Sequence, residues 1–318
     1  MRNFIVWAIL ITGVAYGGAK FYLHSEVSDA MDMVVLMTAP YGDVEYDGVR
    51  STLTGELTVE GVRVRIDGYT DDLYIDRVGI DTPSFLSLVA LSDLTSKGPD
   101  AMPEYIGFLV EGMRIPVDAD YFADLYEFSL AIREAEATQE ASAQCTGKYG
   151  FSPATLAALG YEEQVFDMYM TLRDEKTQYS IEMDMSMESM WDVDIDIAFA
   201  GNMMTEFMQG MAYQPRLRDM HIEFTDRSLN QRVAKYCGEL GLDAADTLSA
   251  QVDSFMTIGE SNGIEFDQYI IDPYKEFVLG KPTLVVTAKP NNPVAFSQID
   301  LYKPSDVPAL LNLSAVAR

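Results

Sequence analysis

The sequence predicts an α+β protein in which antiparallel β-sheets are flanked by helices, with one N-terminal transmembrane helix. Two observations indicate this fold class. Several stretches alternate apolar and polar residues over eight or more positions, which is the period of a half-buried strand. A single uncharged apolar run, from Phe4 to Ala19, stands near the N-terminus.

The apolar run predicts the compartment. Its length is close to the shortest that crosses a bilayer. Arg2 precedes it and acidic residues from Glu26 onward follow it, which is the charge order of a segment whose N-terminus stays in the cytoplasm. We therefore expect residues 1–24 to form a single-pass anchor in the bacterial inner membrane and residues 25–318 to form a periplasmic α+β domain. One alternative is cleavage of a signal segment near Gly17-Gly18-Ala19, which would leave a soluble periplasmic protein. Another is a buried N-terminal helix.

Length and charge limit the function. The chain of 318 residues can bury a sizeable core, either as one domain or as two halves, 25–140 and 150–318. Its 50 acidic and 22 basic residues give a net charge of −28, which argues against nucleic acid as a partner. A solvated acidic surface explains this charge. The alternative is an acidic face for a basic partner or for cations.

The two cysteines are predicted to form a disulfide. Cys145 and Cys237 are far apart in the sequence, and neither has a second cysteine nearby, so neither belongs to a CxxC redox or zinc unit. In an oxidising compartment an even pair of this kind is typical of a disulfide. Two separate buried thiols are the alternative.

The first half of the domain mixes strands and helices. Residues 25–37 carry apolar positions at helical spacing, and Pro40 and Gly42 end that helix. Alternating segments between 44 and 80 predict strands, divided by glycines that include a candidate bulge at Gly61. We expect a short helix from 84 to 96, a strand from 105 to 117 and a helix that ends near 138.

The clearest pattern lies between Phe166 and Phe224, where four segments alternate strictly between apolar and polar residues. This predicts an antiparallel meander with one apolar and one acidic face. The apolar face is expected to hold Met183, Met185, Met187, Val193, Ile195 and Ile197, which are our candidates for a lipid-binding groove. Helices at 228–239 and 243–258 are expected to cover most of this face, with a groove at one edge.

Methionines are concentrated in the meander, where 11 of the 18 lie between Met168 and Met220. Their spacing fits an ordinary apolar sheet face. Methionine also suits adaptable apolar surfaces that accept varied ligands, and thioethers can bind Cu(I). These three interpretations stay open at the level of sequence.

Catalytic motifs are weak. Asp192, Asp194 and Asp196 form an acidic ladder, but they lack the loop geometry and glycine of a calcium site. His24 and His221 are the only histidines, so a serine or cysteine triad is poorly supported. The sequence also has no phosphate-binding glycine loop. We expect no metal and no cofactor.

The N-terminal quarter carries a family resemblance. The segment from Gly55 to Val64 reads Gly-Glu-Leu-Thr-Val-Glu-Gly-Val-Arg-Val, and the segment from Leu73 to Pro83 follows with a similar alternation. Together with the apolar N-terminal run, this resembles the start of AsmA-like envelope proteins. The resemblance implies a curved sheet with an apolar surface that handles lipid.

The function expected from these observations is a non-enzymatic binding or assembly protein of the cell envelope. Its apolar sheet face would hold acyl chains, and its partners would be the inner membrane, through the N-terminal segment, and lipid or another envelope protein. A periplasmic hydrolase that uses carboxylates or a metal is the first alternative. A structural subunit of an inner-membrane complex is the second.

Overall fold

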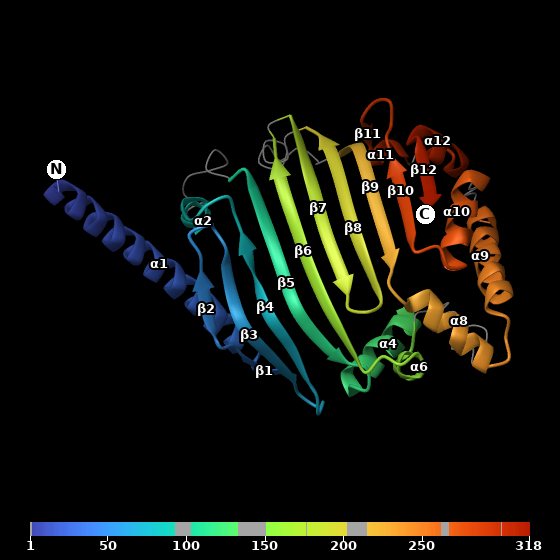
Figure 1. Cartoon of the computed structure of the whole chain (residues 1–318), viewed down its shortest axis with the longest axis horizontal. Coiled ribbons are helices and arrows are strands. Elements are labelled where there is room, and N and C mark those ends of the chain that lie inside the picture. The colour runs from blue at the N-terminus through green and yellow to red at the C-terminus, as the bar shows by residue number, and fades with distance from the viewer. Residues whose placement is uncertain are drawn as a thin grey trace. The chain divides into compact units, whose positions relative to one another are not determined.

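The computed structural model describes residues 2–92, 103–132, 151–175, 177–201, 215–261, 267–299 and 301–318, and the side chains of its first helix from Lys20 onward. The chain divides into two compact units, Met1–Gly112 and Met113–Arg318. Each unit is described by itself. Figure 1 labels the helices and strands along the chain.

Unit 1 is an antiparallel sheet with a long helix against it. Strands β1 and β2 both pair with β3, which in turn pairs with β4. Strand β5 begins in unit 1 and ends in unit 2. The elements are α1 (Arg2–Thr38), β1 (Gly42–Glu45), β2 (Gly48–Ser51), β3 (Leu57–Ile66), β4 (Asp72–Asp81), α2 (Phe85–Ser92) and β5 (Tyr105–Pro116).

The core of unit 1 joins α1, α2 and β3. Leu23 of α1 is buried with Leu57, Phe85 and Leu88, and Val27 packs against the same cluster one helical turn later. Burying these side chains on one side of α1 fixes the helix to the sheet, because each buried apolar side chain contributes about 1.5–3 kcal/mol.

Strand β3 keeps one continuous register with β4 past Gly61. Glu60 stands opposite Arg77 and Val62 opposite Ile75, so one residue of each strand, Gly61 and Asp76, lies between these pairs. The φ of +64° at Gly61 is a left-handed conformation that glycine adopts without strain. A Cβ at this position would overlap the carboxylate of Asp47. Neither strand has an extra residue at this point, so the bulge predicted at Gly61 is wrong, and the glycine is required by its backbone conformation and by Asp47.

The expected fold class is wrong in its transmembrane helix. Among the residues whose side chains the structure describes, no helix is long and apolar enough to cross a membrane. The described part of α1 includes Lys20, Glu26, Asp29 and Asp32, and it buries Leu23 in the core of unit 1. These charges and this packing make that half of α1 a helix of the folded unit. The apolar side chains from Phe4 to Ala19 lie outside the described residues.

Unit 2 is built on an antiparallel meander, as the alternation predicted. Strands β6, β7, β8 and β9 pair in chain order, followed by β10 and β12, while β11 adds to β9. Figure 1 shows β6 to β10 side by side. The strands are β6 (Glu163–Asp174), β7 (Gln178–Met187), β8 (Trp191–Ala200), β9 (Arg216–Asp226), β10 (Thr283–Ala288), β11 (Val294–Ala295) and β12 (Leu313–Ala317).

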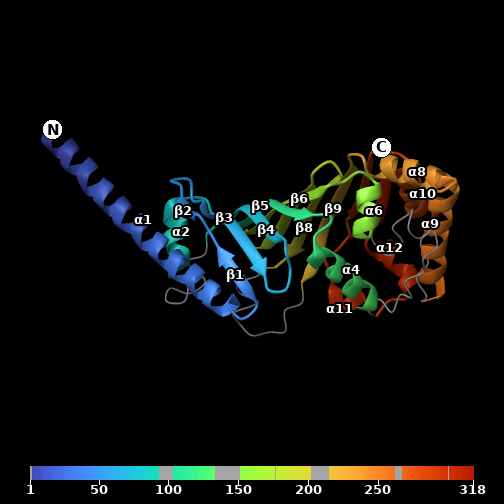
Figure 2. The same ribbon diagram turned by 90° about the horizontal axis from the view of Figure 1, so that it is seen from below.

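The helices of unit 2 mostly follow the meander. Figure 2 shows α8, α9 and α10 gathered together, and α10 packs on β12 and β10. The helices are α4 (Asp120–Ile132), α6 (Pro153–Ala158), α8 (Leu229–Glu239), α9 (Ala244–Ser261), α10 (Gln268–Val278), α11 (Phe296–Ile299), the 3₁₀ helix η2 (Pro304–Asp306) and α12 (Val307–Leu310). The helices predicted at 228–239 and 243–258 correspond closely to α8 and α9.

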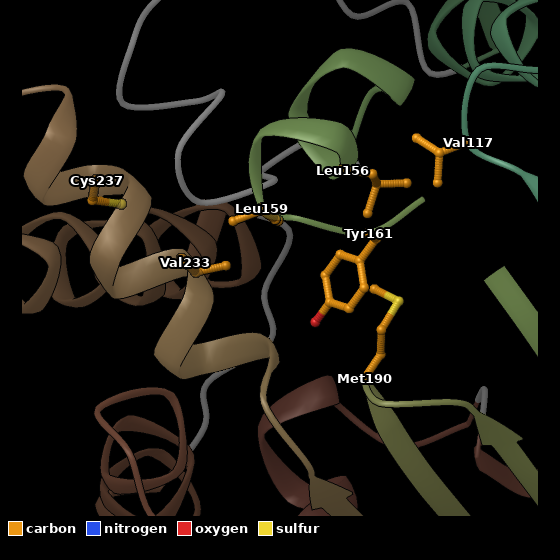
Figure 3. Close-up of a cluster of buried hydrophobic side chains, with 7 residues drawn as sticks. All are labelled: Val117, Leu156, Leu159, Tyr161, Met190, Val233 and Cys237. Atoms are coloured by element: carbon orange, nitrogen blue, oxygen red, sulfur yellow. The ribbon is translucent and has the colours of Figure 1, made fainter. Parts of the chain in front are cut away.

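Two buried clusters lie at opposite ends of the meander strands. The first, which we call the helix-end cluster, joins α6, α8 and the β7–β8 turn, and Figure 3 shows the ring of Tyr161 beside the side chain of Met190. Its members are Val117, Leu156, Leu159, Tyr161, Met190, Val233 and Cys237. The second, the far cluster, consists of Tyr179, Phe199, Leu217 and Ala288.

The β7–β8 turn is held by the segment that leads into α8. Ser189 adopts a φ of +63°, which is unusual for a residue with a side chain. The backbone N–H groups of Arg227 and Ser228 donate to the carbonyl of Met190 at 3.0 and 3.4 Å, and the Ser228 hydroxyl donates to the carbonyl of Ser189. The turn is thus fixed by hydrogen bonds from residues that come almost forty positions later in the chain.

Candidate functional site

The candidate site is the apolar face of the meander. Residues directly opposite on paired strands share a face, so the registers define rows of side chains across the sheet. One row runs Met168, Met185, Val193, Phe224, and the next runs Met170, Met183, Ile195, Ile222. The prediction that the six candidate residues share one face is confirmed by these registers.

The structure divides the six candidates by their surroundings. Met187 packs against the helix-end cluster, and Ile197 packs against the far cluster. Val193 is buried, at 8% exposure. Met183, Met185 and Ile195 are half-buried between the two clusters. The two ends of the face thus adjoin buried clusters, whereas Met183, Met185 and Ile195 belong to neither cluster.

The half-buried middle extends over four strands, and we call it the methionine face. Successive rows are about 7 Å apart along a strand, and neighbouring strands are about 4.8 Å apart, so it covers roughly 7 by 14 Å between side-chain positions. Its members are Met168, Met170, Met183, Met185, Ile195 and Ile222, all of them half-buried. Sequence reasoning did not include Met168, Met170 and Ile222 among the candidates, although their alternation was visible.

Aromatic side chains border the methionine face. Phe224 lies in the same row as Met168 and Met185, and its ring contacts Trp191 at 5.9 Å and Phe277 of α10 at 5.3 Å between centroids. The nearly perpendicular Phe224–Phe277 contact, at 83°, is a favoured edge-to-face geometry. Helix α10 thus covers the β9 side of the face. The helices α8 and α9 were expected to cover most of it. Helix α8 instead buries Val233 and Cys237 in the helix-end cluster, and Ala244 and Leu248 of α9 pack against the same cluster.

The opposite side of the meander is acidic, and we call it the carboxylate face. Asp184 stands directly opposite Asp194, which stands directly opposite Glu223. Glu182 and Asp196 form the next row, with His221 beyond them. Like charges in such positions repel each other and destabilise a sheet.

Cations neutralise the margins of the carboxylate face but not its centre. Arg227 pairs with Asp192 at 2.5 Å, and Arg318 pairs with Glu223 at 2.8 Å. Within the described residues, no ion pair involves Asp184 or Asp194. Like charges are therefore left facing each other at the centre of the meander.

The central carboxylates are electrostatically coupled. Partial burial raises the pKa of Asp194, and a hydrogen bond with Asp184, followed by repulsion from Asp184, Glu223 and Asp192, raises it further. A hydrogen bond between two carboxyl groups needs one proton between them. Because Asp194 remains exposed, water screens part of this effect.

The structure describes both histidines and most of the acidic side chains that could hold a metal ion. In the part of the chain that the structure describes, no group of three or more histidine, cysteine, aspartate or glutamate side chains is arranged to hold a metal ion. His221 lies 3.7 Å from Glu223 on the exposed sheet face, which is an ordinary surface contact. His24 lies in unit 1 and contacts the hydroxyl of Ser51 at 3.0 Å.

The structure describes one of the two cysteines of the predicted disulfide. Cys237 is completely buried in the helix-end cluster and carries no free thiol. Cys145 lies outside the described residues. The pairing of Cys145 with Cys237 therefore stays a prediction.

A cavity of about 630 Å³ lies among the helices of unit 2. It is formed where α8 and α9 begin and α10 ends, with Asp226, Asn230, Leu248 and Leu279 among its lining residues. Burial raises the pKa of Asp226, but backbone N–H groups of Asn230 and Leu229 donate to its carboxylate and lower it again in part. Asp226 thus accepts hydrogen bonds from the first backbone N–H groups of α8, whose N-cap residue is Ser228.

A comparison with protein families gives one result. A family model described as "Uncharacterized protein" matches residues 154–318. The chain belongs to this family. The matched region runs from α6 to β12, so it contains the whole methionine face and the whole carboxylate face. No curated protein and no solved structure matches the chain.

Proposed function

We propose that this chain is a non-enzymatic binding protein of the cell envelope, and that unit 2 holds an acyl chain on the methionine face. The observation that carries the proposal is the group of six half-buried apolar side chains of the methionine face, which lies between two buried clusters. Apolar surface that stays in contact with water costs about 25 cal/mol per Å², so an apolar ligand that covers it gains that free energy.

The chemistry of the face favours a flexible ligand. Four of its six side chains are methionines, which have three rotatable bonds and a polarisable sulfur and adapt to varied apolar shapes. In the described structure the face has no charged member, so it offers nothing to a polar headgroup. A hydrocarbon chain fits these properties. The resemblance of residues 55–83 to AsmA-like proteins points to the same ligand class.

The proposed compartment follows from the sequence. The run from Phe4 to Ala19 behind Arg2 has the composition of a segment that directs export. An oxidising compartment would also explain why Cys237 carries no free thiol. A reporter fused after Thr38 tests this, because a cytoplasmic readout contradicts export.

The lipid proposal is tested with two variants that introduce a carboxylate at adjacent positions of β7. Met185→Asp places a carboxylate on the methionine face, whereas Ser186→Asp places it on the opposite face of the same strand. We expect native mass spectrometry to find acyl ligand on the wild-type protein and on the Ser186→Asp variant, and to find none on the Met185→Asp variant. Binding of parinaric acid, a fluorescent fatty acid, should follow the same order.

Two outcomes would contradict the proposal. The first is a wild-type protein that carries no lipid and does not bind parinaric acid. The second is equal binding by both variants, because a charge on the methionine face would then have no effect. Thermal unfolding shows whether a loss of binding is caused by unfolding of the variant. Because Met185 is half-buried, the Met185→Asp protein should still unfold in a cooperative transition. If it does not, Met185→Ser is the milder substitution for the same measurement.

A further inference from the structure

The C-terminal end of α1 exposes an apolar surface that the methionine face does not explain. Met33, Leu36, Met37 and Tyr41 are 62%, 75%, 69% and 75% exposed. Met33 lies three and four residues before Leu36 and Met37, so the three side chains share one side of the helix. We call these four residues the α1 stripe. Contiguous exposed apolar surface of this kind marks interaction sites in soluble domains.

The α1 stripe is held in a fixed orientation by the other side of the helix. Leu23 and Val27 pack into the core of unit 1, and Figure 1 shows the C-terminal half of α1 beside β1 and β2. The hydroxyls of Ser28 and Tyr46 lie 3.4 Å apart, and the backbone N–H of Asp67 donates to the carbonyl of Tyr41 at 3.0 Å. The stripe therefore belongs to a rigid surface of the folded unit.

The chain segment that carries the α1 stripe is acidic. Residues 21–49 contain six acidic residues and no lysine or arginine. Glu26, Asp29 and Asp32 are exposed on the turns that precede the stripe, whereas Asp43, just after it, stands opposite Arg65 of β3. A partner must therefore match an apolar strip with carboxylates at its N-terminal end.

We propose that the α1 stripe docks a basic amphipathic helix of a partner protein. An apolar face on that helix would cover the four exposed side chains, and its lysines or arginines would meet the flanking carboxylates. An anionic membrane surface and a second copy of this chain are both disfavoured, because each would bring negative charge against Glu26, Asp29 and Asp32. The surface lies in unit 1 and does not depend on lipid binding in unit 2.

The test measures binding of a labelled synthetic helix to the full chain by fluorescence anisotropy. The probe carries leucines on one face and lysines on the other. The stripe variant combines Leu36→Ser with Met37→Ser, and the control variant combines Leu53→Ser with Leu86→Ser, whose side chains are similarly exposed at 70% and 77%. We expect the stripe variant to bind about tenfold or more weakly than wild type, and the control variant to bind as wild type does.

Charge is tested with the same probe. Replacing its lysines with glutamates should abolish binding, and added salt should weaken the binding of the lysine version. Equal binding to the wild-type protein and the stripe variant would overturn the proposal, because the probe would then recognise the general acidity of the chain. Wild-type dimers that the stripe variant does not form, or neutral-lipid vesicles that only the wild type binds, would overturn it in favour of a second copy or a membrane.

Discussion

Replacing Asp194 with asparagine should stabilise unit 2 at neutral pH. Asp194 stands directly between Asp184 on β7 and Glu223 on β9, so three carboxylates meet in one row of the sheet. An asparagine in its place removes the central charge. The asparagine also supplies an N–H donor to the Asp184 carboxylate. In the wild-type protein the same hydrogen bond requires a proton shared between the two carboxyl groups.

The expected gain is about 1 kcal/mol. A like-charged pair directly opposite in a sheet costs roughly 0.2–1 kcal/mol, and Asp194 takes part in two such pairs. Arg318 offsets part of the charge of Glu223, and solvent screens the exposed Asp194, so the lower half of the summed range is appropriate. In a unit of this size about 1 kcal/mol corresponds to a rise of roughly 2–4 °C in Tm.

The gain should shrink in acid. The folded pKa of Asp194 is raised above its ordinary value of 3.8, so the folded protein holds its proton more tightly than the unfolded chain does. The cost of the ionised carboxyl is fully present above the folded pKa and disappears as the pH falls toward 3.8. The stability difference between Asp194→Asn and wild type should therefore decrease over the same interval.

Urea denaturation at pH 7 and near pH 4 measures both effects. Glu163→Gln is the control, because Glu163 is an exposed residue of the same unit and its loss also removes one negative charge. The reasoning would be refuted if Asp194→Asn left stability unchanged or lowered it at pH 7. It would also be refuted if Glu163→Gln gave the same gain, since the effect would then come from the net charge of the chain.

Three further predictions address other parts of the fold. Gly61→Ala should destabilise unit 1 by about 1–3 kcal/mol, because its φ is positive and its Cβ would meet a carboxylate, whereas Gly48→Ala, with open space, should be nearly neutral in urea titrations. Burial and then Lys20 lower the pKa of His24, so the contribution of this histidine should be present above its ordinary pKa of 6.5 and lost as the pH falls through the lowered value. A His24→Gln variant should lack that part of the pH profile, and an unchanged profile would contradict this assignment. Thiol labelling of the unfolded, unreduced chain should find no free thiol, while two labels would show that Cys145 and Cys237 are not joined.

The alternation of residues predicted the meander and the composition of its two faces. A strand between Phe166 and Leu172 with an apolar residue at every second position can bury only one face, so the assignment of faces needs no further information. The register between neighbouring strands could not be predicted in the same way, because each alternating segment fits its neighbour equally well after a slip of two residues. The opposition of Asp184, Asp194 and Glu223 therefore could not be predicted, although each residue was correctly placed on the polar face.

For the N-terminal helix, the local sequence pattern did not predict the role of the segment. Hydropathy separated an apolar run from a charged segment, and this suggested a membrane helix that continues into a charged helical segment at 25–37. The structure has one continuous helix from Arg2 to Thr38, whose residues from Leu23 onward pack on the sheet of unit 1. Tertiary packing at Leu23 decides the role of the described half of α1, and it depends on residues such as Phe85 and Leu88 that lie more than sixty positions away.

The turn between β7 and β8 affects the order in which unit 2 can fold. Strand β7 pairs with β6 and strand β8 pairs with β7, so the contacts among these three strands close short loops and cost little chain entropy. The hydrogen bonds that hold Met190 come from Arg227 and Ser228, and they cannot form until β9 has joined and α8 has begun. We therefore expect an early three-strand nucleus whose turn remains loose, and a late step that fixes this turn and assembles the helix-end cluster around it.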